Sequence, residues 1–591
     1  MRRLTITILL AAASLYGCYA EPVTRRQATD YAARRLHLAQ PLGARTSAEI
    51  PGFGHNGAAP TFYVIDNPDG GWVIISGDNC TRPVLAYSDK GRFNTGNIPG
   101  NVRSWLCNID KGISELRRKG VSPGRNAISE WASAGTGTRN AASEGKELKT
   151  ACWSQQSPFC DLCPRPTAGC VAVAVGIVMR FHQWPGHGQG YLPSYVTKTE
   201  GISVEGYSIG SHRYDWDNMP LDWNSTWPES SNKEVATLIH DIGVMVKTDY
   251  CTGGASAFTS DIIPAMAEFM DYSTSAIEIN KDNYSDAEWY RMIRDEIDAG
   301  RPIIYGGVDG NIGHEFVCDG YDGNGYIHVN WGWNGECNGY YAVTYPGDND
   351  PNGIGHVFDS EVSAIIGICP SRGGASGKYD TEVQLYAMES AGLYGLKTAS
   401  GSIGRGSAFT LDIGYLVNYS SYAAYDGAIR VALMDSKGTI KEYIGDELPL
   451  HIDKATSNGS FIYPGSTSIK GYKCRITSEV KPGDYITAFY RHPDGRWTRT
   501  GGGRGERCTL SALGVFDICH IRVGNDYADG ELYYPDIIPG HKAIASSALY
   551  YDAVLCTKGY AELHSGKHEI KVTVTFDDGS SESIIQEVTV R

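Results

Sequence analysis

The chain has 591 residues, which is too long for a single hydrophobic core and suggests about three or four domains. Charged residues make up 20% and the formal net charge is −15, with no long basic run, so the composition argues against a nucleic-acid partner. The 71 glycines and 37 tyrosines indicate a turn-rich, β-rich protein, and nothing in the composition requires a cofactor.

Residues 1–20 have the pattern of an export signal. Arg2 and Arg3 precede an apolar stretch from Leu4 to Leu15, and small residues follow before Glu21. Cleavage after Ala20 is one expectation, and the lipobox-like segment ending in Cys18, which predicts a lipid anchor, is the other. No later apolar run reaches the roughly 20 residues that span a bilayer. We therefore expect a secreted or cell-surface protein without a membrane span.

Residues 21–121 predict a small α+β domain. Thr24 precedes a short helical stretch over residues 24–36, and Gln27 stands three positions later, as in a capping box. Three apolar strands are expected at 62–65, 71–78 and 83–88, separated by Gly, Asn, Asp and Pro turns.

Residues 122–147 predict a flexible linker, because the stretch around 134–143 is rich in Gly, Ser, Ala, Thr and Asn. Such a composition buries too little apolar surface to offset the entropy of ordering. We expect proteolytic maturation here, with the new terminus between about Ala134 and Thr150. A spacer that is never cut is the alternative.

Residues 148–372 form the next predicted domain, and Cys170 is its most informative residue. It follows Gly169 and opens an apolar run to His182, for which length favours helix and the valines favour strand. At a helix N-terminus the dipole and unpaired N–H groups favour a thiolate. The alternative is a cysteine that only packs. Helices are also expected at 235–246 and 285–299, and antiparallel strands at 302–306, 315–318, 326–330 and 340–343.

His314 is the expected partner of Cys170. A cysteine early in the domain, a histidine far downstream and Asn330 beyond it have the order of papain-like sites. His182 lies about three turns beyond Cys170 on the predicted helix, roughly 18 Å along its axis, and cannot reach the sulfur. His328 lies on a predicted strand, where a packed or hydrogen-bonded histidine is more typical.

Several short segments closely resemble the streptopain family of secreted bacterial papain-like cysteine peptidases, and the resemblance spans roughly residues 21–370. It implies a papain-like peptidase domain with an inhibitory prodomain at residues 21–121 and no cofactor. It also implies a pocket that favours an apolar residue just before the cleaved position. The segments are Trp153-Ser154-Gln155, residues 169–172, 180–185, Gly306-Gly307, 314–321 and 328–333.

Cys170 would then act as nucleophile and His314 as base and acid. The backbone N–H of Cys170 and the side-chain amide of Gln155 would stabilise the oxyanion, with Gln156 as the alternative donor. Asn330 would orient the imidazole by analogy with papain-like enzymes, or Trp331 would take over that role or shield the ion pair.

The 15 cysteines leave the disulfide pairing open and give little support to a metal site. With Cys18 and Cys170 set aside an odd number remains, so at least one thiol is unpaired within the chain. Cys160 and Cys163 form a lone C-x-x-C, which gives little support to zinc.

Beyond residue 372 the pattern changes to short alternating strands, for example at 409–413, 428–434, 485–490 and 570–576. We expect two all-β sandwich domains, at 373–500 and 501–591, without a catalytic constellation. The predicted fold class is therefore α+β, with a papain-like peptidase domain between an α+β prodomain and all-β sandwich domains.

The predicted function is a secreted zymogen of a cysteine endopeptidase. Its partners would be protein or peptide substrates and its own prodomain. A non-catalytic adhesin or binding protein on a peptidase scaffold is the alternative from another class. An amidase or acyltransferase with the same thioester chemistry is the closer rival.

Overall fold

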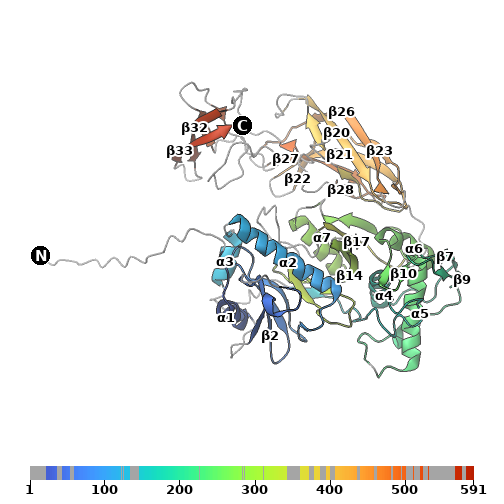
Figure 1. The fold of residues 1–591 in the computed structure, drawn as a ribbon. Helices are drawn as coiled ribbons and strands as arrows, with labels where there is room; N and C mark the ends of the chain where they lie inside the picture. The colour runs from blue at the N-terminus through green and yellow to red at the C-terminus, as the bar shows by residue number, and fades with distance from the viewer. Residues whose placement is uncertain are drawn as a thin grey trace. The chain divides into compact units, whose positions relative to one another are not determined.

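The computed structural model confirms an α+β protein with many antiparallel strands (Figure 1). The signal sequence and Cys18 lie outside the residues that it describes. Those residues are 21–35, 43–53, 59–121, 123, 125–133, 145–224, 226–281, 284, 286–309, 312–342, 360–371, 379–385, 395–398, 406, 408–435, 439–457, 462–480, 484–493, 495–500, 510–511, 519–523, 530–531, 566–575 and 581–590.

The chain divides into two compact units. The first takes residues 1–181, 215–240 and 290–362, and the second takes residues 182–214, 241–289 and 363–591. The predicted domain boundaries stay predictions.

The first 181 residues contain four helices and five strands among those described. They are α1 (Arg25–Arg35), β1 (Ala44–Thr46), η1 (Ser47–Glu49, a 3-10 turn), β2 (Phe62–Asp66), β3 (Trp72–Ser76), β4 (Val84–Ser88), α2 (Gly100–Lys119), α3 (Arg125–Ser133), β5 (Lys146–Glu147) and α4 (Cys170–His182).

Short hairpins and helices follow, and then the strands that carry His314. They are β6 (Tyr191–Leu192), β7 (Tyr195–Val196), β8 (Ser203–Val204), β9 (Tyr207–Ser208), η2 (Trp216–Asn218), α5 (Glu229–Met245), β10 (Asp249–Cys251), β11 (Gly254–Ser256), η3 (Thr259–Asp261), α6 (Ile262–Phe269), β12 (Ile277–Asn280), α7 (Asp286–Asp298), β13 (Ile303–Asp309), β14 (Ile312–Tyr321), β15 (Tyr326–Asn330), β16 (Gly339–Ala342) and β17 (Ser360–Ile366).

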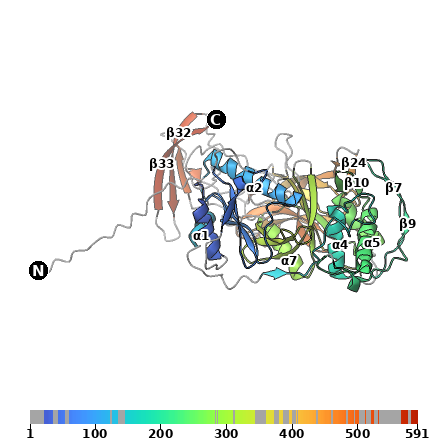
Figure 2. The same ribbon diagram turned by 60° about the horizontal axis from the view of Figure 1, so that its bottom comes forward.

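One antiparallel sheet in the first unit joins the N-terminal domain to the strand that carries His314. Its strands lie in the order β1-β2-β3-β4-β16-β15-β14-β13, and the joint is the pairing of Tyr87 on β4 with Tyr340 on β16. The Tyr87 hydroxyl also donates to Asp322 at 2.8 Å, and the Tyr326 hydroxyl donates to the carbonyl of Val84 at 2.8 Å. Figure 2 shows α2 lying across this sheet. The N-terminal domain is thus bonded to the peptidase strands through its edge.

Many predicted elements are confirmed. The N-terminal helix begins after Thr24, whose backbone N–H donates to the Gln27 side chain at 2.8 Å, while the Gln27 N–H donates back to the Thr24 hydroxyl at 3.2 Å. The three N-terminal strands form β2, β3 and β4, and the apolar run after Gly169 is the helix α4. The four strands expected around His314 form the antiparallel set β13 to β16.

The predicted linker is partly wrong, because residues 125–133 form α3. Trp131 on this helix packs edge-on against Tyr31 with ring centroids 5.2 Å apart, and its indole N–H donates to the carbonyl of Thr81 at 2.9 Å. Lys146 and Glu147 form β5 and pair with β14. The apolar contacts of Trp131 therefore order a segment whose neighbours are poor in apolar residues. Residues 134–144 lie outside the described part.

The helix α2 was not predicted from the sequence, although its pattern is clear. It ends at Gly120, whose φ of 62° lies in the left-handed region that glycine tolerates best. Its buried apolar side chains recur every three or four positions: Val102, Trp105, Leu106, Ile109, Ile113 and Leu116.

The described strands after residue 383 form antiparallel sheets. Two of these sheets, built around β20 and β21, share one apolar core that includes Leu411, Ile413, Val431 and Ile486. The strands are β18 (Gln384–Leu385), β19 (Leu396–Thr398), β20 (Ala408–Asn418), β21 (Tyr425–Met434), β22 (Ile440–Tyr443), β23 (Leu448–Ile452), β24 (Thr456–Ser457), β25 (Ile462–Tyr463), β26 (Gly465–Arg475), β27 (Tyr485–Arg491), β28 (Trp497–Arg499), β29 (Leu510–Ser511), β30 (Cys519–Val523), β31 (Gly530–Glu531), β32 (Gly566–Thr575) and β33 (Ser581–Val590).

A shared core between two sheets is the packing expected of the first sandwich. The second predicted sandwich is represented by the sheet β31-β30-β32-β33 and stays a prediction. None of the described helices is long and apolar enough to cross a membrane.

Candidate active site

Cys170 is the first residue of α4, as the sequence predicts. Gly169 before it has a φ of 88°, a conformation that glycine adopts without strain, and this turn leads the chain into the helix. The following residues from Val171 to Met179 are buried, so the helix is fixed in the core by its apolar surface. Cys170 itself is half-buried at the end of the helix.

The surroundings of Cys170 raise the pKa of its thiol above the usual value of a cysteine. Burial raises its pKa to about 11, although the backbone N–H of Glu315 hydrogen-bonds the sulfur and lowers the pKa in part; the Glu315 carboxylate raises it again. The expectation that the helix N-terminus favours the thiolate does not hold in this state, because desolvation outweighs the N–H groups. A thiolate at this position therefore needs a cationic partner.

His314 lies on β14, which comes against the start of α4. The hydrogen bond from Glu315, its neighbour, to the Cys170 thiol brings the two candidate residues into one site. On β13, Gly306 leaves room for the Glu315 side chain, since a Cβ there would lie 2.6 Å from the carboxyl group. His314 is half-buried, and a Cβ added to Gly100 would lie 3.8 Å from its Nε2 atom.

The N-terminal end of α2 therefore lies against the candidate site. Asn101 is fully buried there and donates from its side-chain amide to the carbonyl of Trp331 at 3.4 Å. Its side-chain oxygen accepts from the indole N–H of Trp333 at 3.1 Å. Sequence reasoning missed Gly100 and Asn101, because no local pattern marks the end of a helix as the part that enters another domain's site.

Gln155 lies close to Cys170 along the fold. Its carbonyl accepts from the N–H of Ala168 at 2.9 Å, two residues before Cys170, and its side chain is buried. The adjacent Gln156 is exposed. This difference in burial favours Gln155 over Gln156 as the oxyanion donor, and the assignment stays a prediction.

The Asn330 amide bonds to groups other than His314. It donates to the Thr150 hydroxyl at 3.0 Å and to the carbonyl of Ala151 at 2.9 Å, and its oxygen accepts from the N–H of Gly332 at 3.2 Å. Those contacts occupy both of its N–H donors. An orienting role for Asn330 on the imidazole therefore stays a prediction for another state of the enzyme.

Trp331 is buried in an aromatic cluster beneath the site. Its ring lies 4.7 Å from that of Phe316 and 5.1 Å from that of Tyr341, measured between centroids. Trp105 of α2 also packs edge-on against Tyr341, with ring centroids 4.9 Å apart. Trp331 thus supports the strand of His314 by packing, and its predicted role in shielding the ion pair stays a prediction.

The two other histidines of the predicted motifs have local partners. His328 contacts Asp319 at 2.5 Å through its Nδ1 atom, which agrees with the expectation of a hydrogen-bonded histidine. His182, at the far end of α4, lies 3.1 Å from the Tyr272 hydroxyl. None of the cysteines that the structure describes with side chains forms a disulfide.

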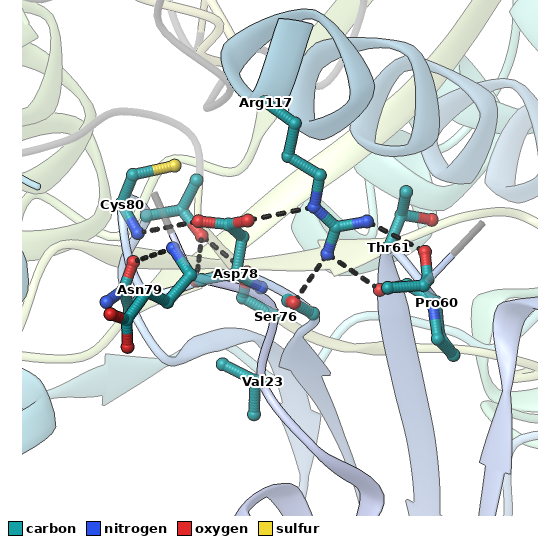
Figure 3. A network of polar contacts seen from close by, with 12 residues as sticks. Val23, Pro60, Thr61, Ser76, Asp78, Asn79, Cys80 and Arg117 are labelled. Carbon is teal, nitrogen blue, oxygen red and sulfur yellow. Dashed lines mark hydrogen bonds and ion pairs between the residues drawn. The ribbon is translucent and has the colours of Figure 1, made fainter. Parts of the chain in front are cut away.

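Arg117 anchors the opposite end of α2, as Figure 3 shows. Its Nε atom donates to the fully buried Asp78 at 2.8 Å, and its remaining nitrogens donate to the carbonyls of Ala59, Pro60 and Gly77 at 2.6–2.9 Å. A planar guanidinium can satisfy several acceptors at fixed angles, which a lysine cannot. Arg117 therefore fixes the helix whose first turn lies against His314.

We expect Arg117→Ala to loosen α2 and to speed conversion of the precursor to its mature form. Removal of one partner leaves the Asp78 carboxylate buried without its counter-charge, at a cost of about 3 kcal/mol. Conversion followed by gel electrophoresis, together with thermal unfolding of an uncleavable precursor, measures the effect. Arg118→Ala is the matched control, since Arg118 is exposed and pairs with Glu115 on the same helix. Equal conversion rates for the two variants would refute the anchoring role.

Comparisons with known proteins agree with this site. Residues 153–341 match the Peptidase C10 family and residues 20–113 match the Spi protease inhibitor family. The thiol protease/hemagglutinin PrtT of Porphyromonas gingivalis is 28% identical over 414 residues, which cover 66% of this chain and 47% of PrtT. Streptopain of Streptococcus pyogenes is 26% identical over 356 residues, which cover 56% of this chain and 86% of streptopain. The chain thus spans about half the length of PrtT.

Among solved structures, active interpain A cysteine protease of Prevotella intermedia is 30% identical, with 38% of this chain and 94% of interpain A covered and a TM-score of 0.33. A prointerpain A fragment is 27% identical, with 52% and 94% covered and a TM-score of 0.41. With a candidate Cys–His site inside the matched region and an inhibitor-type domain before it, this chain belongs to the peptidase C10 family of cysteine peptidases.

Proposed function

We propose that the chain is the secreted zymogen of a cysteine endopeptidase. The observation that carries the proposal is the contact between the Glu315 N–H and the Cys170 sulfur, which brings the strand of His314 to the first turn of α4. Family membership supports the same chemistry. Export rests on the signal-like residues 1–20, with lipid attachment at Cys18 as the alternative.

In the mature enzyme, Cys170 attacks the carbonyl carbon of the peptide bond as a thiolate paired with the His314 imidazolium. The carbonyl oxygen takes up the negative charge, stabilised by the backbone N–H of Cys170 and the Gln155 amide. His314 then protonates the leaving amine, and a thioester remains on Cys170. The same imidazole removes a proton from water, which hydrolyses the thioester and restores the thiol.

The N-terminal domain acts as the inhibitor in this proposal. Its helix α2 lies against His314, so the domain would keep the imidazolium from the Cys170 thiol, whose pKa burial raises. Activation requires a cut between that domain and β5. Since Lys146 and Glu147 pair with β14, we expect the cut before Lys146, within the range from Ala134 to Thr150 that the sequence predicts.

A non-catalytic adhesin or binding protein is the competing function, and an amidase or acyltransferase is the rival within the enzymes. The presence of both Cys170 and His314 favours an enzyme, and the tail after residue 372 has no assigned role. Proteins or peptides are the proposed substrates.

Digestion of a peptide library by the matured enzyme tests the proposal. We expect cleavage inside peptides, with an apolar side chain preferred just before the cut. A labelled amine added as acceptor separates hydrolysis from acyl transfer. Cleavage products equal to those of a Cys170→Ala control would reject the peptidase and leave the binding protein.

A further inference from the structure

A continuous chain of hydrogen bonds connects the start of the peptidase segment to the strands that follow His314. His328 Nδ1 contacts Asp319 Oδ1, and the other Asp319 oxygen accepts from the Thr150 hydroxyl. That hydroxyl accepts from the Asn330 amide at 3.0 Å, and the Asn330 oxygen accepts from the Gly332 N–H at 3.2 Å. Asp319 and Asn330 are buried, with exposed fractions of 2% and 1%.

Thr150 is the central residue of this chain of hydrogen bonds, because its hydroxyl donates to the buried Asp319 and accepts from the buried Asn330. Asp319 and Asn330 also form hydrogen bonds with the backbone on either side of Thr150. The carbonyl of Asp319 accepts from the Leu148 N–H at 2.7 Å, and the Asn330 amide donates to the carbonyl of Ala151 at 2.9 Å. Residues 148–151 are thus attached to β14 and β15 by side chains and not only by backbone pairing.

Two parts of this chain of hydrogen bonds lead to the candidate active site. Ala151 is bonded by Asn330, and Gln155 lies four residues further on, with its carbonyl accepting from the N–H of Ala168 next to the Gly169-Cys170 step. At the Gly332 end, a Cβ added to Gly332 would lie 3.3 Å from Cγ1 of Val173, which is in the first turn of α4. The chain of hydrogen bonds therefore links the segment of Gln155, the helix of Cys170 and the strands next to His314.

We propose that Thr150 is a positioning residue that sets the place of the Gln155 amide relative to Cys170 in the mature enzyme. Thr150 does not touch the reacting atoms. It acts through Ala151 and the short segment that leads to Gln155, and the pair of the buried Asp319 and the partly buried His328 fixes it. This inference rests on the proposed peptidase function.

The chain of hydrogen bonds ends at His328, whose charge depends on pH. Burial lowers the pKa of His328, but the charge and hydrogen bond of Asp319 outweigh it and leave the pKa above its usual value. Glu147 on β5 raises this pKa further and Lys90, after β4, opposes it, while the Tyr340 ring lies edge-on at 5.0 Å. The ion pair with Asp319 is therefore present below the pKa of His328 and is lost as the pH rises through it.

Thr150→Val and Thr150→Ser in the matured enzyme test the proposal, because valine keeps the shape without the hydroxyl and serine keeps the hydroxyl. For Thr150→Val we expect kcat to fall about 10- to 100-fold with little change in KM, as for a misplaced catalytic group. Alkylation of Cys170 by iodoacetamide at about pH 6 should change less than about twofold, since it needs the thiolate but no oxyanion donor. Thr150→Ser should remain within about threefold of wild type in kcat.

His328→Gln is the second variant, in case Thr150→Val does not fold. It removes the charge at the end of the chain, so the ratio of wild-type kcat to its kcat should be larger at about pH 6 than at about pH 9. A ratio that does not vary with pH, a wild-type kcat in Thr150→Val, or a parallel loss of alkylation and kcat overturns the inference. Absence of peptide cleavage by the matured wild type would instead reject the proposed function, and the two failures are distinct.

Discussion

Cys170→Ala is expected to abolish peptide hydrolysis, with turnover at least roughly 10⁴-fold below that of the wild type. In the proposed mechanism the Cys170 sulfur forms the covalent intermediate, and no other group of the proposed site would replace it. Self-conversion should stop as well, and the variant should remain full length until active enzyme is added. N-terminal sequencing of the product then places the cut, which we expect before Lys146.

The fold should survive this substitution. Cys170 is half-buried at the first position of α4, where alanine fits and favours helix, so the free energy of unfolding should change by less than about 1 kcal/mol. Cys251→Ala is the matched control, because Cys251 is a free thiol on β10. Full activity in Cys170→Ala, or its loss in Cys251→Ala, would show that Cys170 is not the nucleophile.

Local signals in the sequence were sufficient for many elements of the fold. Thr24 and Gln27 bond to backbone N–H groups that have no partner within the first turn of a helix. This pair of residues therefore predicts the start of a helix without reference to the rest of the fold. The apolar run after Gly169 was long enough to favour a helix over a strand despite its valines. These predictions depend on neighbours within a few residues.

The contacts that define the site depend on residues far apart. The Asn330 amide was expected near His314 by analogy, but in this structure it bonds to Thr150 and Ala151, residues 180 and 179 positions away. Asn101 meets Trp331 across 230 positions. No periodicity carries such information, because tertiary packing decides which of several donors and acceptors meet.

The helix α3 shows that amino-acid composition alone can fail to predict an ordered segment. The surrounding residues are small and polar, yet Trp131 finds Tyr31 and the carbonyl of Thr81, and these contacts outweigh the low propensity of the stretch. The buried Ala127 and the hydrogen bond from the Tyr31 hydroxyl to the carbonyl of Glu130 add to the contacts that hold these nine residues. Composition predicts order only as an average over a segment.

In the proposed zymogen, the raised pKa of the Cys170 thiol would account for the lack of activity. A pKa of about 11 leaves almost no thiolate at neutral pH, and α2 lies against the histidine that would supply the counter-charge. In the proposed activation, removal of the N-terminal domain would free the side of His314 that faces Gly100. The inactivity of the precursor would then depend on Cys170 and His314 together and not on the cysteine alone.

His314→Ala is expected to reduce peptide hydrolysis by roughly 10³-fold or more, because the imidazole serves both as base and as acid in the cycle. The variant also lacks the cation that stabilises the thiolate. At about pH 6 a thiol with an ordinary pKa is less than about 1% ionised, so alkylation of Cys170 by iodoacetamide should be slowed about 100-fold relative to the matured wild type. Both proteins must be cut by added active enzyme before the comparison, so that the prodomain does not mask the thiol.

The alkylation rate should also depend on pH in a different way in the two proteins. In the wild type it should be nearly constant from about pH 6 to 8, whereas in His314→Ala it should rise about tenfold per pH unit, as expected for a thiol that titrates alone. Labelling must be followed on the peptide that contains Cys170, because the chain has other free thiols. His182→Ala is the matched control, since His182 lies at the far end of α4 against Tyr272 and should leave the profile unchanged. A wild-type profile in His314→Ala would mean that another group stabilises the thiolate, and His314 would lose its place in the site.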